Sequence, residues 1–194
     1  MRFKSLKIDG AKLIQIDARP DSRGFFARTF CAEEFAAQGL PPAVAQSSIS
    51  YNAKAGTVRG MHFQWPPSRE GKLVRCLRGG LFDVLVDLRP QSPTYLQHEA
   101  VTLDQDNRDA VFIPHGIAHG FQTLADDTEV LYQMTDFFAA ELQTGFRWND
   151  AAFGVSWPLA VTVISDRDAA CADFNRAAYE AEYARRSLAS GSTP

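Results

Sequence analysis

The sequence predicts an all-β protein built as a jelly-roll sandwich or small barrel, with short helices at its periphery. Short runs rich in Val, Ile, Leu, Phe and Tyr recur along the chain with turn residues between them. No helical segments alternate with these runs, which argues against a parallel sheet. A chain of 194 residues can bury one full core and is short for two. We therefore expect a single domain over residues 1–188.

The expected strands are β-branched or aromatic runs bounded by turn residues. They cover residues 24–30, 57–64, 72–77, 81–88, 95–103, 110–113, 120–124 and 129–136. A short helix is expected over residues 31–38, because Gly39 and two prolines follow it. An alanine-rich, charged helix is expected over residues 169–187, packed on the outside of the barrel. Residues 189–194 are expected to be disordered.

Composition excludes several classes of partner. The formal charge of −3 provides no basic surface for nucleic acid or an anionic membrane. The first residues alternate charged and apolar side chains, unlike a signal peptide, and no apolar run is long enough to span a bilayer. The three cysteines are widely spaced, which is typical of reduced thiols, so we expect a cytoplasmic protein. Cys76 lies in an apolar strand and is interpreted as a buried structural cysteine.

The segment Arg59-Gly60-Met61-His62-Phe63-Gln64 contains the first candidate catalytic residue. His62 follows Arg59 by three positions, so the two side chains would lie on opposite faces of a regular strand. A bulge or twist at Gly60 would bring both into one cavity. Taken alone, His62 is better interpreted as a hydrogen-bonded core histidine than as a catalytic one. The residues around it decide between the two interpretations.

Lys72 and Tyr132 are the next candidates. Lys72 begins an apolar strand, where a lysine is usually a solvated strand end. If it points inward beside Arg59, the two cations could bind a phosphate and stabilise a developing oxyanion. Tyr132 alternates with apolar residues and is expected on an inward strand face. There it is equally readily a core tyrosine or a proton donor.

A metal site is considered at the segment Pro114–His119, which has the P-x-G-x-x-H form of the second cupin motif. In metal-binding cupins this histidine joins a His-x-His pair and a glutamate of the first motif. Here the first motif position has His62 followed by Phe63 and Gln64, so the second histidine of the pair is missing. Imidazole is a ligand that transition metals prefer, so we expect no metal.

Taken together, these segments resemble the dTDP-4-dehydrorhamnose 3,5-epimerases, which are cupin-fold enzymes of nucleotide-sugar metabolism. The matching segments occur in the family's order over about three quarters of the chain. They are residues 21–26, 59–64, 72–75, 83–89, 92–94, 113–121, Tyr132, 148–150, 157–158 and 165–168. The resemblance implies a cupin-type jelly roll and a metal-free epimerase without a cofactor.

The resemblance also implies roles for individual residues. His62 matches the base that removes a proton from the sugar, and Asp168 matches its dyad partner. Lys72 matches the residue that stabilises the enolate oxygen, and Tyr132 matches a proton donor on the other face of the sugar. The positions that match substrate-binding residues are Arg23, near the diphosphate, Phe26, Arg28, Gln46, Ser48, Arg59, His119, in the sugar site, and Phe138.

Elementary chemistry supports these roles. A 4-keto group acidifies the protons on C3 and C5, because the resulting carbanion delocalises onto O4 as an enolate. The reaction therefore needs a base, an oxyanion stabiliser and an acid, and no redox cofactor. Histidine titrates near neutrality, and a positioned acid or base typically contributes ~10²–10⁴-fold to the rate.

Several positions depart from the family pattern, mainly around the nucleotide. Ser48 stands in place of an asparagine, Glu70 in place of a glutamine, and Phe137-Phe138 in place of a pair that usually contains tyrosine. Arg28 stands in place of a glutamate. A guanidinium suits the acceptors of cytosine, whereas a carboxylate suits the N3–H of thymine, so Arg28 favours a CDP-sugar if it faces the base. Otherwise it pairs with a phosphate or with a carboxylate of a partner chain.

Three further alternatives stay open at the level of sequence. Relatives with this fold can epimerise only C3 or only C5. The family is homodimeric with exchanged strands, so Gln46 or Phe26 could serve the neighbouring subunit's pocket. Outside the family, a metal-dependent cupin and a non-catalytic binder of sugar nucleotides are the remaining hypotheses.

Overall fold

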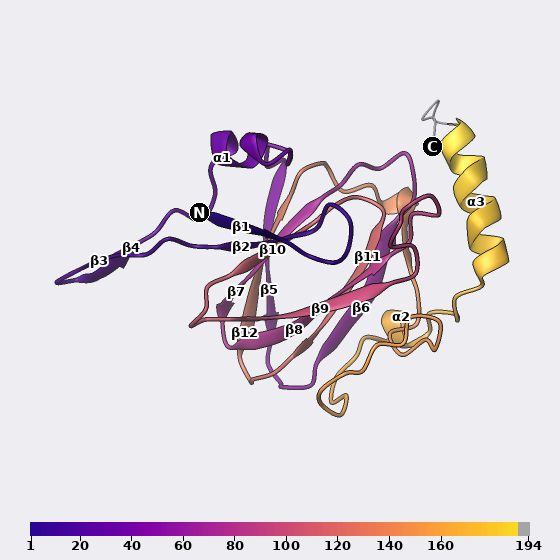
Figure 1. The fold of residues 1–194 in the computed structure, drawn as a ribbon. Coiled ribbons are helices and arrows are strands. Elements are labelled where there is room, and N and C mark those ends of the chain that lie inside the picture. The colour runs from indigo at the N-terminus through magenta and orange to yellow at the C-terminus, as the bar shows by residue number, and fades with distance from the viewer. Residues whose placement is uncertain (190–194) are drawn as a thin grey trace.

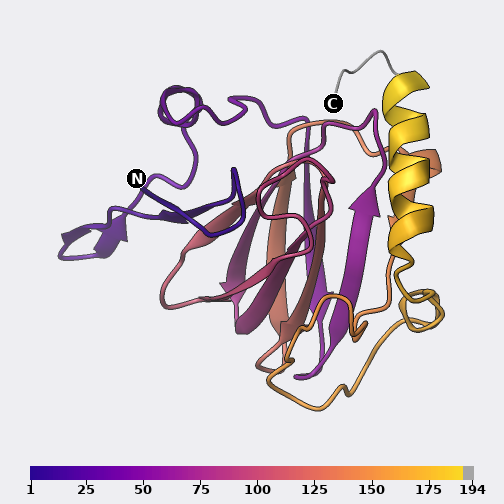
Figure 2. The same cartoon turned by 45° about the vertical axis from the view of Figure 1, so that its right-hand side comes forward.

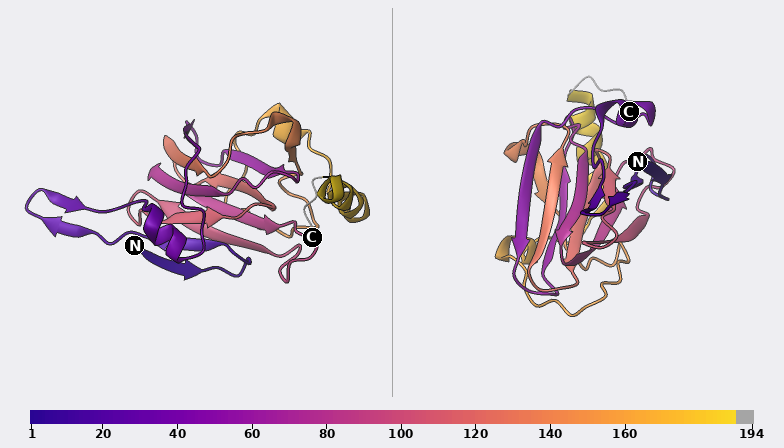
Figure 3. Two further views of the ribbon diagram at one scale, coloured as in Figure 1. Left: turned by 90° about the horizontal axis from the view of Figure 1, so that it is seen from above. Right: turned by 90° about the vertical axis from the view of Figure 1, so that its left-hand side faces the viewer.

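The structure is a computed structural model, and it describes residues 1–189. Two antiparallel sheets pack face to face as a sandwich (Figure 1; Figure 3). The first sheet has the strand order β1 (Arg2–Ser5), β2 (Lys12–Gln15), β10 (Ala110–Ile113), β7 (Lys72–Arg78), β12 (Thr128–Met134) and β5 (Gln46–Asn52). The second has the order β13 (Gln143–Gly145), β6 (Val58–Gln64), β11 (Ile117–Thr123), β8 (Gly80–Asp87) and β9 (His98–Asp104).

A two-stranded hairpin and short helices surround the sandwich. The hairpin consists of β3 (Arg19–Asp21) and β4 (Gly24–Phe26), and it projects away from both sheets (Figure 1, left). We call residues 19–26 the arm. The helices are α1 (Ala32–Ala37), the 3₁₀ turn η1 (Ala140–Leu142), α2 (Asp166–Ala169) and α3 (Arg176–Ala189).

Alternation along the strands produces the layers. In β8, Leu81 and Leu85 point into the space between the sheets, whereas Val84 and Val86 point to the outer face of the second sheet. Helix α3 covers that outer face, as Figure 2 shows. Its Tyr179 contacts the ring of Phe63. Because α1 covers the first sheet in the same way, apolar surface is buried in three layers.

The predicted all-β sandwich with peripheral helices is confirmed, with errors at particular elements. The strands expected over 95–103 and 120–124 begin at His98 and Ile117 instead. The C-terminal helix expected over 169–187 is present as α3, but it begins only at Arg176, because a non-helical segment separates it from the short helix α2. Asn175 precedes α3, and its side-chain oxygen accepts a hydrogen bond from the Ala178 amide at 3.0 Å. This cap starts a new helix where the alanine-rich composition indicated a continuous one.

The sequence analysis did not predict five strands, namely β1, β2, β3, β5 and β13. Strand β5 has the polar sequence QSSISYN, which lacks the apolar alternation of a strand that packs on a core. The reason is its position at the edge of the first sheet, beside a cavity. Ala189 ends α3, and the rest of the segment expected to be disordered, residues 190–194, lies outside the described residues.

The structure bears on two sequence expectations, the absence of a membrane-spanning segment and reduced cysteines, within the described residues 1–189. No helix in this part of the chain is both long and apolar enough to cross a membrane. Cys31, Cys76 and Cys171 form no disulfide among the described residues. Cys76 is buried as predicted, and burial raises the pKa of its thiol to about 11. Such a thiol is a poor nucleophile at neutral pH.

Candidate active site

A cavity of about 370 Å³ lies between the two sheets, which is within the usual size range of small-molecule sites. Strands β5, β7 and β12 of the first sheet and β6, β11 and β13 of the second supply most of its lining. Its lining residues are Gln46, Ser48, Ser50, Arg59, His62, Phe63, Gln64, Glu70, Lys72, His119, Phe121, Tyr132, Met134, Phe138 and Gln143. The structure therefore brings together most, but not all, of the site residues predicted from the sequence.

Gly60 explains why both Arg59 and His62 line the cavity. His62 is paired with His119 across β6 and β11, Arg59 is paired with Phe121, and the register shifts between these two pairs. Gly60 has a φ of +110°, and a Cβ there would lie 2.7 Å from the Cα of Gly120. The local irregularity predicted at Gly60 is therefore present, and it turns side chains three positions apart toward one space.

His62 forms a pair with Asp168, a residue 106 positions away in the chain. Its Nε2 lies 2.9 Å from Oδ1 of Asp168, and Oδ2 accepts a hydrogen bond from the Gly60 amide at 3.1 Å. Ser165 caps the short helix α2 by accepting the Asp168 amide at 3.1 Å, which holds that carboxylate in place. His62 keeps a side-chain exposure of 32%, so its ring is accessible from the cavity.

Hydrogen bonds keep Asp168 ionised. Burial by itself would raise the pKa of Asp168, but the hydrogen bonds from His62 and from the Gly60 amide outweigh it, so the pKa is lowered. The ionised carboxylate orients the imidazole and favours a proton on Nε2. The other ring nitrogen, Nδ1, is then the one that can accept a proton.

Lys72 and Tyr132 also point into the cavity. Lys72 lies on the same face of β7 as the core residue Val74, and its Nζ is 3.3 Å from Oε1 of the buried Glu70. Burial first, and then the Asp83 carboxylate, raise the pKa of Tyr132 above its ordinary value. The phenol therefore stays protonated at neutral pH and is able to donate a proton.

Asp83 is a functional candidate that the sequence reasoning missed. Its Oδ1 lies 2.7 Å from Nε2 of His119, and both side chains are buried. In β8 it stands between Leu81 and Leu85, on the inner face of the sandwich. A carboxylate on an otherwise apolar strand face was the signal that could have identified it, because a buried charge needs a partner.

The nucleotide-side candidates divide into two groups. Gln46 and Ser48 lie on the cavity-facing side of β5, together with Ser50, which the sequence reasoning did not select. The side-chain oxygen of Gln46 accepts the Phe138 amide at 2.7 Å, and this bond ties β5 to the segment after β12. Gln46 therefore lines the cavity of its own chain.

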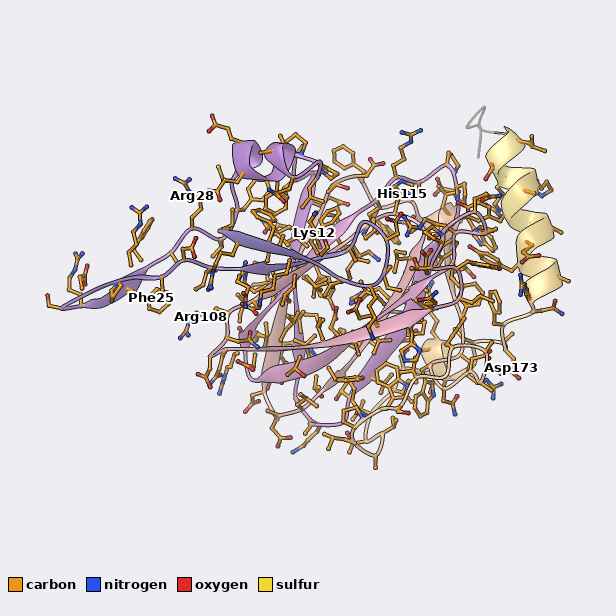
Figure 4. The ribbon with its side chains drawn as sticks, viewed as in Figure 1. Lys12, Phe25, Arg28, Arg108, His115 and Asp173 are labelled. Carbon is orange, nitrogen blue, oxygen red and sulfur yellow. The ribbon has the colours of Figure 1, made fainter. Side chains whose placement is uncertain are left out.

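Arg23, Phe26 and Arg28 do not line this cavity. Arg23 lies in the arm and pairs with Asp21 at 2.7 Å. Phe26, also in the arm, is 72% exposed. Arg28, labelled in Figure 4, follows the arm, and it pairs with Glu34 of α1 at 3.2 Å. Within one chain, these three residues are separated from the catalytic candidates.

The donor set around His62 is unlike that of a metal-binding cupin. Gln64 lies on the same face of β6 as His62, where the metal-binding pattern has a second histidine. Within residues 1–189, His, Cys, Asp and Glu side chains form no group of three or more that could hold a metal ion.

Comparisons with known proteins assign the chain to a family. A family model described as dTDP-4-dehydrorhamnose 3,5-epimerase matches residues 5–176. The chain is 43% identical over 169 residues to the dTDP-4-dehydrorhamnose 3,5-epimerase of Sinorhizobium fredii, covering 87% of each protein. It is 37% identical over 169 residues to the dTDP-4-dehydrorhamnose 3-epimerase of Streptomyces niveus, covering 87% of this chain and 81% of the relative.

A solved structure is similar over nearly the whole fold. The crystal structure of dTDP-4-dehydrorhamnose 3,5-epimerase from Bacillus anthracis, with TDP and PPi bound, superimposes with a TM-score of 0.86 at 34% identity. The match covers 89% of this chain and 99% of that one. The chain is an isomerase that belongs to the dTDP-4-dehydrorhamnose 3,5-epimerase family.

Proposed function

We propose that the protein epimerises C3 and C5 of a dTDP-4-keto-6-deoxy sugar by removing a proton from one face of the ring and returning one from the other. The observation that carries this proposal is the His62–Asp168 pair at 2.9 Å in a cavity that also contains Lys72 and Tyr132. These residues match the base, oxyanion stabiliser and acid that the chemistry requires. The nucleotide bound in the Bacillus anthracis structure supports dTDP as the carrier.

The reaction begins at His62. Its Nδ1 removes the proton from C3 or C5, and the electron pair of the broken C–H bond moves through the carbonyl onto O4. Asp168 stabilises the imidazolium that forms, without taking its proton. Lys72 donates a hydrogen bond to the O4 enolate, and its pairing with Glu70 leaves ammonium hydrogens free for this contact. The C4=O4 double bond then re-forms, and the deprotonated carbon takes a proton from the opposite face of the ring.

Tyr132 supplies that second proton. It projects from β12 of the first sheet, whereas His62 projects from β6 of the second, so the two side chains approach a ligand in the cavity from different sheets. Transfer of the phenolic proton to the ring carbon gives the inverted centre. A base and an acid on separate sheets are a physical basis for inversion, because one residue acting alone would return the proton to the face from which it came.

The arm suggests how the rest of the substrate is held. Phe26 on the arm and Ile49 and Tyr51 on the outer face of β5 are apolar and more than half exposed, at 72%, 62% and 53%. An exposed apolar face on an edge strand favours association with a second copy. In the homodimer that we propose, the arm of one subunit reaches the cavity of the other and brings Arg23 to the diphosphate and Phe26 to the base.

Arg28 bears on the choice of nucleotide. Its ion pair with Glu34, which also binds the N-terminal ammonium at 2.8 Å, gives it a structural partner within the chain. This pairing supports dTDP over the cytosine alternative, because the guanidinium is already engaged. Calorimetric titration with dTDP, CDP, GDP and UDP measures the preference, and tighter binding of CDP would reverse this assignment.

The reaction itself is tested by proton-to-deuteron exchange in D₂O, followed by NMR on dTDP-4-keto-6-deoxyglucose. We expect the wild type to exchange both C3 and C5, and His62→Ala to lose exchange by at least ~10²-fold. Tyr132→Phe should retain exchange while losing most of the inverted product, because the first proton is still removed.

The matched control is His98→Ala, since His98 is an exposed histidine on β9 and does not line the cavity. Exchange at the wild-type rate in His62→Ala would rule out His62 as the base. Exchange confined to C3 or to C5 in the wild type would identify a mono-epimerase, as the name of the Streptomyces niveus relative indicates for that protein.

A further inference from the structure

The carboxamide of Gln64 has no hydrogen-bond partner within the described part of the chain. Both its Nε2 and its Oε1 are buried, and neither has a partner. Gln64 lies two residues beyond His62 on the same face of β6, and it lines the same cavity. A buried amide without partners costs free energy in the folded protein, because water satisfies both groups in the unfolded chain.

Neighbouring polar side chains are engaged elsewhere. Gln143 is the cross-strand neighbour of Gln64, but its Oε1 accepts a hydrogen bond from Arg167 at 2.9 Å. Glu70 is bound to Lys72 at 3.3 Å. Neither of these interactions involves Gln64, so its amide remains able both to donate and to accept a hydrogen bond.

The position of this amide indicates which part of a ligand it would meet. Gln64, Glu70 and Lys72 line the catalytic cavity together, and they also line a small cleft that continues from it. If Lys72 binds O4 of the sugar, the groups next to O4 on the ring are the C3 hydroxyl on one side and the C6 methyl, carried by C5, on the other. An amide favours the hydroxyl, because a methyl group would leave both of its polar atoms unsatisfied.

We propose that Gln64 binds the C3 hydroxyl of the sugar, donating to and accepting from it, and thereby fixes which side of the ring faces β6. Gln64 is then a specificity-determining residue that contacts the substrate beside the reacting carbons. This inference rests on the proposed epimerase function and assigns a further residue to it. In metal-binding cupins, the position of Gln64 is occupied by the second histidine of the His-x-His pair. In this protein, the same strand face would bind a sugar oxygen instead of a metal.

The test combines Gln64→Met with a substrate analogue that lacks the C3 hydroxyl. The analogue keeps the 4-keto group and the C5 proton, so exchange at C5 in D₂O reports on both substrates. We expect Gln64→Met to lower kcat/KM for C5 exchange of the normal substrate by about tenfold to a hundredfold. Beyond any intrinsic effect of the hydroxyl on the reactivity of C5, removing it should cost the wild type a similar factor and should cost Gln64→Met nothing more.

The double comparison cancels any intrinsic effect of the hydroxyl on C5 acidity, which is the same for both enzymes. The assignment would be overturned if the effects of the substitution and of the missing hydroxyl on kcat/KM multiply. Wild-type kinetics in Gln64→Met would overturn it as well. Absence of exchange in the wild type would instead reject the proposed function, so the two failures are distinguishable.

Thermal unfolding without ligand provides a second readout. Methionine has the shape of glutamine without its polar groups, so Gln64→Met should be as stable as the wild type or more stable. A binding role predicts this combination of unchanged or raised stability with lowered activity. Gln97→Met, at an exposed position directly before β9, is the matched control and should alter neither property. A large loss of stability in Gln64→Met would assign the amide to the fold and overturn the proposal.

Discussion

At the scale of single residues, the cavity is organised by pairs of a basic and an acidic side chain. Three of its basic side chains have a carboxylate within hydrogen-bonding or ion-pairing distance. The pairs are His62–Asp168, Lys72–Glu70 and His119–Asp83. Arg59 differs from them, because it is bound by the neutral side chain of Asn52 at 2.7 Å. Its charge is therefore available to an anionic substrate, whereas each of the three paired side chains is held in place by its carboxylate.

Asp168 should make stability depend on pH. Its pKa is lowered in the folded protein, so its contribution to stability is present above the pKa of the unfolded chain, about 4, and is lost as the pH falls through the folded value. We expect Asp168→Asn to unfold more easily at pH 7 by about 1–3 kcal/mol and to lose less stability than the wild type between pH 5 and pH 3. Urea unfolding at several pH values measures both quantities.

The control for this prediction is Asp173→Asn. Asp173 pairs with Arg147 at 2.8 Å on the surface, as Figure 4 places it, and its side chain is 71% exposed. It should change stability little, because exposed ion pairs contribute little. An unchanged acid dependence in Asp168→Asn would contradict the account of this carboxylate.

At the scale of elements, the irregularity in β6 determines which side chains reach the cavity. The strand would otherwise direct Arg59 and His62 to opposite faces. The close approach of β11 at Gly60 leaves no room for a side chain, since a Cβ would also lie 2.7 Å from the carbonyl oxygen of His119. The geometry of the candidate site therefore depends on a backbone position as much as on the side chains.

Gly60→Ala should impair both stability and catalysis. The added methyl group must push β6 away from β11, and a φ of +110° is unfavourable for alanine. We expect a loss of roughly 2–4 kcal/mol and a fall in kcat beyond what partial unfolding explains. Urea unfolding and kinetics of the folded fraction separate the two effects.

Gly80→Ala provides the comparison in the same sheet. The nearest atom to a Cβ at Gly80 is 3.5 Å away, an ordinary contact. That variant should fold and turn over nearly as the wild type does. Equal behaviour of the two variants would show that the approach of β11 at Gly60 is not restrictive.

At the scale of the whole molecule, the residues that we propose bind the substrate do not all line one chain's cavity. The sandwich holds the side chains proposed for proton transfer, whereas Arg23 and Phe26 lie on the arm outside the cavity, as Figure 1 shows for the hairpin. The arm contacts its own chain near its tip through Phe25, over which Arg108 lies at 4.9 Å. A dimer in which each arm serves the other cavity would unite the two sets.

Subunit mixing tests this arrangement. Arg23→Ala and His62→Ala should each be weak or inactive alone, because one lacks the diphosphate contact and the other lacks the base. Random reassociation of equal amounts should restore about a quarter of wild-type activity, since half of the dimers are mixed and each of these has one complete site. Activity is assayed after denaturation and joint refolding.

The control is His62→Ala alone, denatured and refolded in the same way, and it should recover no activity. If the arm served the cavity of its own chain, the mixed dimers would contain no complete site. No recovery in mixed samples that are shown to be dimeric would therefore contradict the exchange of arms.

Much of this protein could be derived from local patterns in its sequence. Alternation identified the strands that pack on the core, such as β7 and β8, because a half-buried strand must place apolar groups on every second residue. The motif around His62 and the family resemblance selected the residues that we propose transfer protons. Errors were concentrated in β5 and in the helix expected over 169–187, where a polar cavity face and a capping residue override composition.

Only the tertiary structure shows the contacts between residues that lie far apart in the sequence. Asp168 reaches His62 across 106 residues, and Asp83 reaches His119 across 36, because strand register and the capped turn of α2 place them there. The orphaned amide of Gln64 could be recognised only once every neighbour's hydrogen bonds were known. Sequence by itself determined the fold class, the family and the types of chemical group, since these follow from short-range periodicity and motifs. Which groups meet depended on packing two sheets together, since contacts between distant segments exist only in the folded chain.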